Sequence, residues 1–454
     1  MKLLLATLLL SASAALAQES VQNRMPAVQM PSSSSSSQES APPVASPPDA
    51  LAETADRAAV TLDALLAAAR THNPTLRAAQ ASIAESAGQA KQAGLLPNPV
   101  IGYEGDQIRG GSYGGGEQGG FVQQTIPLGG KLGLRRDVYR AQQRTGELAL
   151  AEQQQRIEAD LESSFYAALA LQQEIATRKQ LSALAADAAA TARQLANVGQ
   201  ADTPDVLQSE VEQEQAALDT LAAQRRYIAA FHQLAAIAGQ PDLPLARLAG
   251  NLAASPAMPP SLDSILAESP AVARADAAVR AAEAQLRSTR REIVPDLTLR
   301  AGEQSNGELL QQNPNVAVGA QSFASASVDL PLWNRNQGSI ASAQAAVEQA
   351  QAEAARVRLA LRHTAAPLIE QYNIAAAQSA RYKSDLLPRA QRAYELYRGR
   401  YRELAAAYPQ VLVSQRTLFQ LQLTYIQSLG ELWQSSAQLR HFTLSGGLAA
   451  NSDR

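Results

Sequence analysis

The sequence contains no cysteine among its 454 residues. This absence excludes disulfide frameworks, thiolate metal sites and cysteine nucleophiles, whatever compartment the protein occupies. Charges of opposite sign nearly balance, because 39 Lys and Arg face 42 Asp and Glu and give a formal net charge of −3. A chain this close to neutral has no overall electrostatic attraction to nucleic acid. The composition therefore excludes thiol chemistry and argues against a nucleic-acid partner.

Aromatic residues are also scarce, at 4% of the chain, and much of the 46% hydrophobic content is alanine. Alanine buries little area, at roughly 25 cal/mol per Å², but it has the highest helix propensity and lets helices approach closely. We therefore expect long, narrowly packed helices rather than a globular enzyme with a thick interior. Beyond the N-terminal residues, no uncharged apolar run approaches the ~20 residues of a transmembrane helix. Any membrane-spanning part is expected to be β.

The N-terminal residues have the pattern of a secretory signal peptide at 1–17. Lys2 supplies the positive charge, the apolar stretch LLLATLLL follows, and Ala15-Leu16-Ala17 forms a small-residue cleavage pattern before Gln18. Without a cysteine at the cleavage point, the mature chain cannot carry the N-terminal lipid of a bacterial lipoprotein. Residues 18–55 contain six consecutive serines and the proline-rich APPVASPPDA, and this composition predicts a flexible tether.

The rest of the chain is organised as two copies of one unit, at 56–250 and 251–447, with a short tail at 448–454. Four pairs of landmarks recur in the same order at offsets of 200, 196, 204 and 205 residues. They are TLDALL and SLDSIL, Asn73-Pro74 and Ser269-Pro270, Pro127-Leu128 and Pro331-Leu332, and Val206-Leu207 and Val411-Leu412. Four landmarks in order at nearly one spacing indicate an internal repeat.

Each copy is predicted to contain two extended segments followed by a long helical hairpin. In the first copy, a helical stretch at 61–96, broken at Asn73-Pro74, precedes the extended segments. The expected strands are 99–107 and 118–128 in the first copy, and 293–302 and 316–332 in the second. The expected hairpin helices are 131–197 and 204–237, then 336–398 and 409–440. At 1.5 Å per residue the first long helix would extend ~100 Å, and Pro367 is expected to kink the corresponding helix of the second copy.

Apolar residues at heptad-like steps predict that the arms of each hairpin pack as an antiparallel coiled coil. The predicted seam of the first long helix is Leu150, Ile157, Leu161, Ala168, Leu171 and Ile175. Its returning helix offers Leu207, Val211, Leu218, Leu221 and Ile228. The last helix offers Val411, Leu418, Tyr425, Leu429, Leu432 and Leu439.

The extended segments of the second copy alternate between apolar and polar residues. Leu297, Leu299 and Ala301 lie on one face, and Asp296, Thr298 and Arg300 lie on the other. This alternation suits a transmembrane β-barrel with a wet lumen, and equally a half-buried surface sheet. Four strands cannot close a barrel alone, since the smallest known have eight, so the membrane interpretation requires oligomerisation.

Several segments resemble the TolC family of outer-membrane efflux channels. The resemblance covers about residues 60–447 and rests on the opening at 73–83, on PNPVIGYE, and on ANVGQADTPDVLQSE at the first hairpin tip. Within the family, QTIPLGGKLGLR and LPLWNRNQGSIASAQA are most similar to the cobalt-zinc-cadmium and nickel efflux branch. The resemblance implies a mostly α fold with a small β part. Three copies would close a shared 12-stranded outer-membrane β-barrel, continuous with a trimeric α-barrel of coiled-coil hairpins in the periplasm.

The resemblance also implies function and partners. The chain would be the outer-membrane channel of a tripartite efflux system, passing divalent heavy-metal cations to the exterior. Its partners would be two further copies of itself, a periplasmic adaptor (membrane fusion) protein, an inner-membrane pump of the proton-driven RND type, and outer-membrane lipid. It would not be an enzyme and would hold no cofactor.

Candidate site residues fall at the hairpin tips. At the first tip they are Gly199, Asp202, Pro204 and Asp205, and at the second Gly399, Glu403 and Gln410. The resemblance implies that these tips contact the adaptor. Relatives commonly carry aspartates that form a constricting ring at the start of the last helix, where this chain has Gln410 and Val413, so Asp202, Asp205 and Glu403 are the better candidates for a charged constriction.

Two of the tip residues also have local structural explanations. Asp205 follows Pro204 at a helix start, where the macrodipole favours an acid, and this position predicts a capping role. Gly199 is expected to be a helix C-terminal glycine. Both explanations are compatible with a place at the tip.

A second candidate region is the junction between strands and long helices, at Pro127, Gly129, Gly130, Lys131 and Pro331. The lysine after two glycines could suggest phosphate binding. Its place between a strand and the long helix favours a structural junction instead, which is also what the resemblance implies. Arg135 and Arg136 are expected to keep this junction solvated or to form ion pairs there.

Other chemistry has little support. His72, His232, His363 and His441 lie far apart with no HxxxH or HExxH spacing, so no metal site is predicted. The glycine clusters between 110 and 120 lack the lysine of a P-loop, and no nucleophile elbow is present. The competing hypothesis is a secreted coiled-coil scaffold or adaptor without a pore. An adaptor should carry one hairpin and further β-rich modules, so two hairpins favour the channel.

Overall fold

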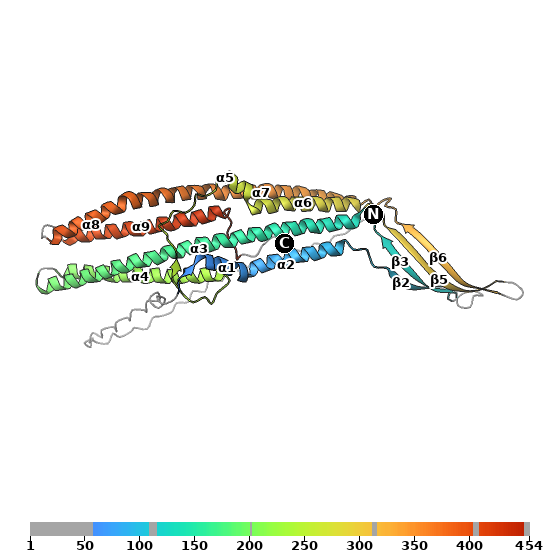
Figure 1. Ribbon diagram of the computed structural model, residues 1–454, viewed down its shortest axis with the longest axis horizontal. Coiled ribbons are helices and arrows are strands. Elements are labelled where there is room, and N and C mark those ends of the chain that lie inside the picture. The colour runs from blue at the N-terminus through green and yellow to red at the C-terminus, as the bar shows by residue number, and fades with distance from the viewer. Residues whose placement is uncertain (1–57, 109–115, 200–201, 311–315, 403–407, 449–454) are drawn as a thin grey trace, which may run out of the picture. The chain divides into compact units, whose positions relative to one another are not determined.

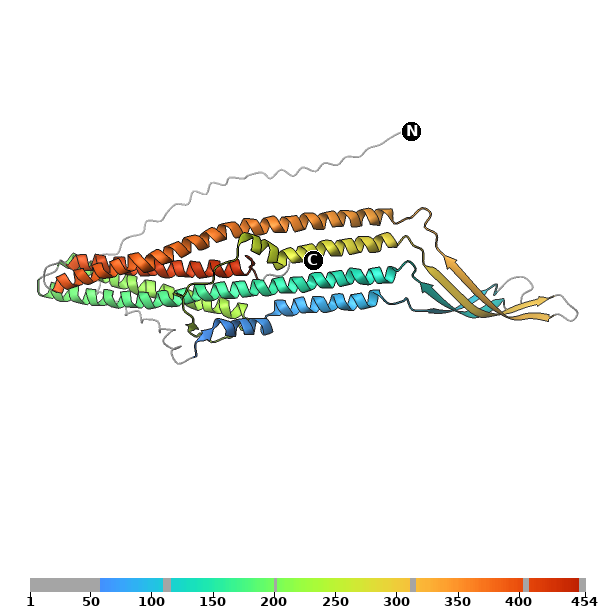
Figure 2. The same cartoon turned by 45° about the horizontal axis from the view of Figure 1, so that its top comes forward.

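A computed structural model describes residues 58–108, 116–199, 202–310, 316–402 and 408–448. Most of these residues are helical, and α2, α3, α6 and α7 lie side by side in that order (Figures 1 and 2). The helices are α1 (Leu62–His72), α2 (Pro74–Ala93), α3 (Lys131–Asn197), α4 (Thr203–Ile237), α5 (Leu262–Glu268), α6 (Pro270–Arg291), α7 (Gln337–Arg381), α8 (Leu387–Arg402) and α9 (Tyr408–Arg440). No helix in the described ranges is both long enough and apolar enough to cross a membrane.

A four-stranded antiparallel sheet has the order β2-β3-β5-β6. Its strands are β2 (Val100–Asp106), β3 (Glu117–Ile126), β5 (Leu297–Leu310) and β6 (Val316–Val328). A separate parallel pair joins β1 (Val60–Thr61) to β4 (Leu248–Ala249). The order of the strands repeats the order of the helices to which they connect, so each strand extends the layer of its own helix (Figure 2).

Local chemistry explains where the shorter helices break. α1 ends at His72, and Asn73 caps α2 by accepting a hydrogen bond from the Thr75 amide at 3.0 Å. Asn73 is buried, and its Nδ2 donates to the Ile237 carbonyl at 3.0 Å, which ties the break to the end of α4. Pro74 follows at the first helical position, where its missing N–H costs nothing. Ser269 and Pro270 hold the corresponding positions between α5 and α6, where the Ser269 side chain makes no capping hydrogen bond.

The main core lies where α1, α3, α4 and α9 meet. Phe165, Tyr227 and Phe231 are among the largest buried side chains. Tyr166 stacks on Trp433 with 4.1 Å between ring centroids, and the Trp433 indole donates to the Leu252 carbonyl at 2.9 Å. This core therefore contains several of the aromatic residues of the chain, whereas others, such as Trp333, are exposed.

The predicted seams of α3 and α9 are largely buried, but the seam predicted for α4 is wrong. Leu207, Val211 and Leu218 are exposed in the described chain, by 56%, 64% and 59%. The buried positions of α4 are instead Ala216, Ala223, Tyr227, Phe231, Leu234, Ala235 and Ile237. Alanines are the buried residues in the outer half of α4, where Leu207, Val211 and Leu218 are exposed, whereas larger side chains are buried from Tyr227 onward.

The second hairpin is less regular than the sequence suggests. Pro367 lies inside α7 without ending it, because the helix continues to Arg381. The regular α pattern changes at Tyr382–Leu386, which form a π-helical turn between α7 and α8. Strand bounds differ too: β5 begins at Leu297, after Pro295, and extends further than expected, whereas β6 ends at Val328, before Pro331.

Candidate functional site

The first hairpin tip is a glycine turn followed by an exposed acidic helix start. Gly199 has φ +73° directly after the last residues of α3, as expected of a helix C-terminal glycine. Asp202 is the N-cap residue of α4, and its carbonyl accepts from the Asp205 amide at 3.0 Å. Asp205 therefore lies in the first turn, beside Pro204, rather than at the cap. Both aspartates are exposed, and the Asp202 carboxylate makes no capping hydrogen bond in the described chain.

The second tip is described only in part. Gly399 lies within α8, and Gln410 is exposed in the first turn of α9. Glu403, the remaining candidate, lies outside the described residues. Gln410, Tyr397 and Val413 line an open cavity of about 400 Å³ between α8 and α9. The two hairpins also meet toward this end, through an ion pair between Arg416 of α9 and Glu212 of α4.

The strand–helix junction is organised around Lys131. Although it is the first residue of α3, its side chain is only 4% exposed. The ammonium lies 2.7 Å from Asp296 Oδ1 and 3.8 Å from Glu292 Oε2. Arg135 adds two hydrogen bonds to Glu292, both at 3.0 Å. The junction is therefore an ion-pair network between the start of α3 and the end of α6, and its lysine is paired with carboxylates rather than presented to a phosphate.

Residues in the left-handed backbone conformation directly precede both long helices at this junction. Gly129 and Gly130 have φ +71° and +73°, and Asn336, which precedes α7, has φ +58°. A Cβ on Gly129 would lie 3.0 Å from Val294 Cγ1. Asn336 fixes its turn by donating from Nδ2 to the Thr289 carbonyl at 2.9 Å. Both prolines are partly buried: Pro127 directly follows the end of β3, and Pro331 lies beyond the end of β6 at Val328.

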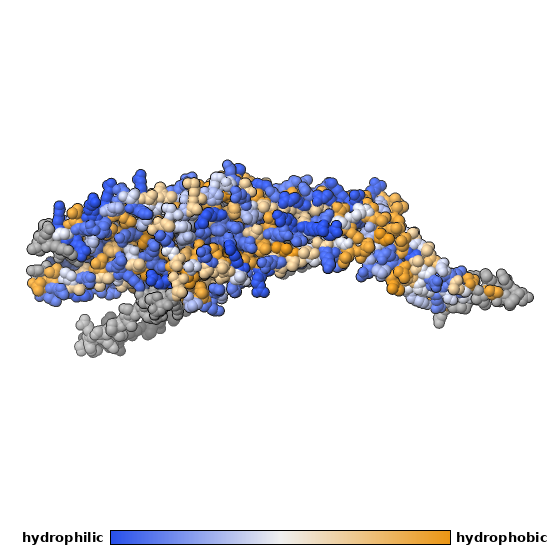
Figure 3. All heavy atoms as spheres, viewed as in Figure 1, coloured by the Kyte–Doolittle hydropathy of each residue, from blue (hydrophilic) through white to orange (hydrophobic). Residues whose placement is uncertain are grey.

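Exposed apolar side chains gather around the same junction, where Figure 3 shows a band of hydrophobic spheres between the helices and the sheet. They include Leu95, Leu96, Leu128, Leu330, Leu332 and Trp333, and Trp333 is 87% exposed. One face of the adjoining sheet continues this apolar surface. Its exposed large residues are Ile101, Tyr103, Val122, Leu299 and Val328, interspersed with Ala301, Ala324 and Ala326.

The opposite face of the sheet is polar. Glu117 accepts hydrogen bonds from Gln304 Nε2 and Asn306 Nδ2, each at 2.9 Å. Arg300 forms an ion pair with Glu104, and its guanidinium stacks on the Phe121 ring at 4.0 Å from the centroid. Sequence alternation assigns Arg300 to this face, but its partners come from other strands and depend on the strand register.

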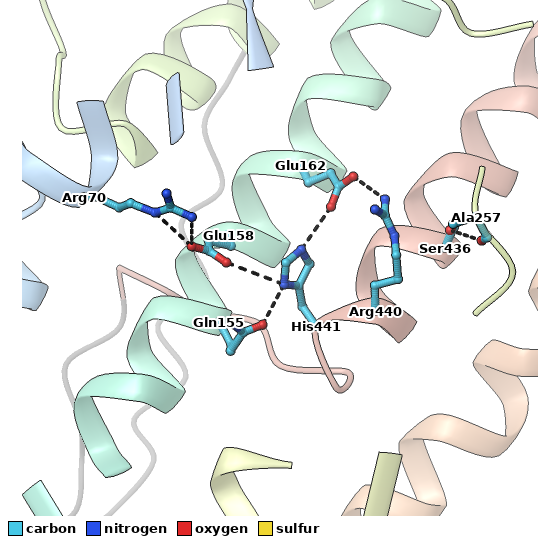
Figure 4. A network of polar contacts seen from close by, with 8 residues as sticks. All are labelled: Arg70, Gln155, Glu158, Glu162, Ala257, Ser436, Arg440 and His441. Atoms are coloured by element: carbon cyan, nitrogen blue, oxygen red, sulfur yellow. Dashed lines mark hydrogen bonds and ion pairs between the residues drawn. The ribbon is translucent and has the colours of Figure 1, made fainter. Parts of the chain in front are cut away.

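A further polar network joins the end of α9 to α3 and α1 (Figure 4). The two ring nitrogens of His441 lie 2.8 Å from Gln155 Oε1 and 3.0 Å from Glu162 Oε2. Arg440 pairs with Glu162, and Arg70 pairs with Glu158 at 2.7 Å.

The pKa of Glu162 reflects its partners in this network. Burial alone raises the pKa of this carboxyl, but the hydrogen bond from His441 and the charge of Arg440 outweigh burial and lower it. Among the described residues, no group of three or more His, Asp and Glu is arranged to hold a metal ion. The contacts of His441 and Arg440 with Gln155 and Glu162 connect the end of α9 to α3, and we call these four residues the clamp.

Comparison with known proteins identifies the family. Residues 65–240 and 261–443 match the family described as outer membrane efflux protein. The chain is 29% identical to the cobalt-zinc-cadmium resistance protein CzcC of Cupriavidus metallidurans, over 84% of this chain and 89% of that protein. It is 28% identical to the nickel-cobalt-cadmium resistance protein NccC of Alcaligenes xylosoxydans xylosoxydans, over 63% and 64%.

The fold is also similar to that of a solved structure. The crystal structure of CusC, described in connection with transmembrane channel formation, superposes with a TM-score of 0.69 at 17% identity, covering 85% of this chain and 92% of that one. The family match extends over both helical hairpins and the whole sheet, with a gap only at 241–260. The long paired helices, the sheet that continues them and this match together show that the chain belongs to the TolC-type outer membrane efflux protein family.

Proposed function

We propose that this chain is the outer-membrane channel of a tripartite efflux system that exports divalent heavy-metal cations. The chain contributes a passage and no chemistry, and it holds no cofactor. An inner-membrane pump of the RND type supplies the energy, and a periplasmic adaptor connects the pump to the helical tips. The metal substrate is proposed because the similarity to CzcC extends over most of both chains.

The observation that carries the membrane assignment is the difference between the two faces of the sheet. One face exposes Ile101, Tyr103 and Val122, and the other carries Glu104, Glu117 and Arg300. A wall between lipid and a water-filled lumen requires this arrangement. The exposed Trp333 beside the apolar face suits the boundary between membrane and water, where aromatic residues are enriched.

The same sheet supports assembly into a trimer. β2 and β6 are its edges, and unpaired edges within a membrane leave backbone groups without partners. Three copies joined edge to edge supply the twelve strands of a closed barrel. The exposed Leu207, Val211 and Leu218 of α4, together with Leu359 and Ile374 of α7, then have neighbouring copies to pack against. The two parts of the chain at 56–250 and 251–447 supply corresponding halves of each wall.

The tips are proposed to contact the adaptor and to close the passage. Asp202 and Asp205 are exposed at the start of α4, and threefold symmetry would make each of them a ring of carboxylates. Residues 1–17 are proposed to direct export, 18–55 to form a tether and 448–454 a tail, and all of these except Leu448 lie outside the described residues. The junction around Lys131 would lie at the inner surface of the outer membrane.

The proposal is tested by fractionation and by metal tolerance. We expect the mature protein in outer-membrane fractions, as a detergent-dependent trimer with three times the chain mass in light scattering. Deleting its gene should lower tolerance to zinc, cobalt, cadmium or nickel and leave tolerance to organic drugs unchanged, with tolerance restored by a plasmid copy. Recovery as a soluble periplasmic monomer would favour the scaffold alternative. Unchanged metal tolerance, with the partner pump intact, would argue against a metal substrate.

A further inference from the structure

Acidic side chains outnumber basic ones on the polar face of the sheet. Cross-strand pairing places Glu104, Asp106 and Glu117 on the face that also carries Arg300. Among the described strand residues that take part in this pairing, Arg300 is the one basic residue of that face, against three acids. The apolar face carries Glu303, which pairs with Gly120 and Ser322.

Arg300 is enclosed rather than free to reach into the space above the sheet. Its ion pair with Glu104 connects β5 to β2 across the intervening strand β3. The guanidinium lies 4.0 Å from the Phe121 ring centroid and 5.5 Å from that of Phe323. A cation over an aromatic face is attracted by the negative charge of the ring face. The side chain is 27% exposed, so most of its charge is covered by these three partners.

Two glycines fix the aromatic rings of this cage. A Cβ on Gly102 would lie 2.4 Å from Phe121 Cζ, and one on Gly302 would lie 2.9 Å from Phe323 Cζ. Each ring therefore occupies space next to the glycine of the adjacent strand that a side chain at the glycine would fill. Because the rings cannot move into the sheet, Arg300 is confined between them, and Glu104 compensates its charge.

We propose that the polar face of the sheet favours the passage of cations over anions, and that Arg300 in its cage with Glu104, Phe121 and Phe323 is a specificity-determining residue. This inference rests on the proposed function, in which the polar face lines the lumen. Charged side chains around a pore select ions of opposite sign. Asp106 and Glu117, which form no ion pair within the described residues, set the preference, and the cage prevents Arg300 from opposing it.

The experiment measures ion selectivity of the full-length trimer in planar lipid bilayers. Under a KCl gradient, the reversal potential of wild-type channels should have the sign of a cation-selective pore. Arg300→Gln should raise the cation-to-anion permeability ratio and Glu104→Gln should lower it, each by about twofold or more, because counter-ion concentration depends steeply on the local potential. Glu303→Gln is the matched control, since it removes a carboxylate from the opposite face and should leave the ratio unchanged.

The results separate this inference from the function on which it rests. A trimer that forms no pores overturns the proposed channel, and the inference with it. Pores without cation preference, or equal ratios in Arg300→Gln and Glu104→Gln, overturn the inference alone. A Glu303→Gln shift as large as that of Glu104→Gln contradicts the assignment of the faces. Each variant is first shown to form the trimer, and Glu117→Gln supplies the same change of charge if Glu104→Gln does not assemble.

Discussion

Lys131 and Asp296 form an ion pair of 2.7 Å across 165 positions of sequence, joining the first residue of α3 to the residue before β5. The lysine side chain is almost completely buried, whereas the aspartate is 37% exposed. The pair therefore connects the strand–helix junction of one part of the chain to that of the other. A buried ammonium that loses its partner keeps its desolvation cost, which makes this pair a test of the junction.

We expect Asp296→Asn to lower the free energy of unfolding by about 1–3 kcal/mol, because it weakens a hydrogen bond between charged groups and leaves Lys131 with Glu292 at 3.8 Å. Urea unfolding of the detergent-purified protein measures the change. Asp137→Asn is the control, since its ion pair with Arg140 is exposed on both sides and should contribute less than about 1 kcal/mol. Equal losses in the two variants would mean that the junction pair contributes no more than a surface pair.

Three glycines near the start of α3 should respond differently to alanine. Gly133 is helical with open space around it, so Gly133→Ala should stabilise the protein by about 0.5–1 kcal/mol. Gly130→Ala should destabilise it by about 1–2 kcal/mol, because φ is +73° although space is available. Gly129→Ala should cost more, since its Cβ would also press on Val294. The same unfolding measurement ranks the three, and a stabilising Gly130→Ala would contradict the left-handed geometry.

The clamp around Glu162 predicts a loss of stability in acid. The pKa of Glu162 is lowered from the ordinary value of 4.5. The clamp therefore contributes its full stability above that value, and this stability is lost as the pH falls through the lowered pKa of the folded state. Unfolding free energies measured from neutral pH into acid should fall more for the wild type than for Glu162→Gln. Glu85→Gln, on an exposed part of α2, should retain the wild-type dependence. Parallel curves for wild type and Glu162→Gln would exclude a role for this carboxylate.

The absence of cysteine makes the two faces of the sheet accessible to labelling. Ser325→Cys on the polar face should react with a hydrophilic maleimide in intact outer membranes, because it lies in the Arg300 row of the sheet. Ala324→Cys, its exposed neighbour on the apolar face, should react only after the membrane is dissolved. Labelling is read by mass spectrometry. Reaction of both cysteines in intact membranes would contradict burial of the apolar face in lipid.

The helix boundaries can be predicted because they depend on neighbouring residues. Asn73 and Pro74 end one helix and start the next through a side-chain cap and a missing N–H, and both features are visible in a dipeptide. The seam of α4 cannot be predicted in the same way. A heptad search favours large aliphatic residues such as Val211, but that side chain faces outward, and Ala216 and Ala223 form the close contact instead.

The site can be predicted only where it depends on chain order. Gly199 and Lys131 stand out in the sequence by their positions between elements, and the structure places both at those connections. The partners of Lys131 and of Arg300 cannot be found in this way, because they come from strands and helices distant in sequence. Finding Glu104 beside Arg300 requires the register of β2, β3 and β5, which alternation alone does not determine.

The π turn at Tyr382–Leu386 has a consequence for symmetry. A π turn closes over one residue more than an α turn, and the described residues of α3 and α4 in the first hairpin form regular α-helix without such a turn. The outer parts of the two hairpins are then rotated differently about their axes. Six hairpins from three chains would present two alternating kinds of surface, so an adaptor would encounter threefold rather than sixfold symmetry.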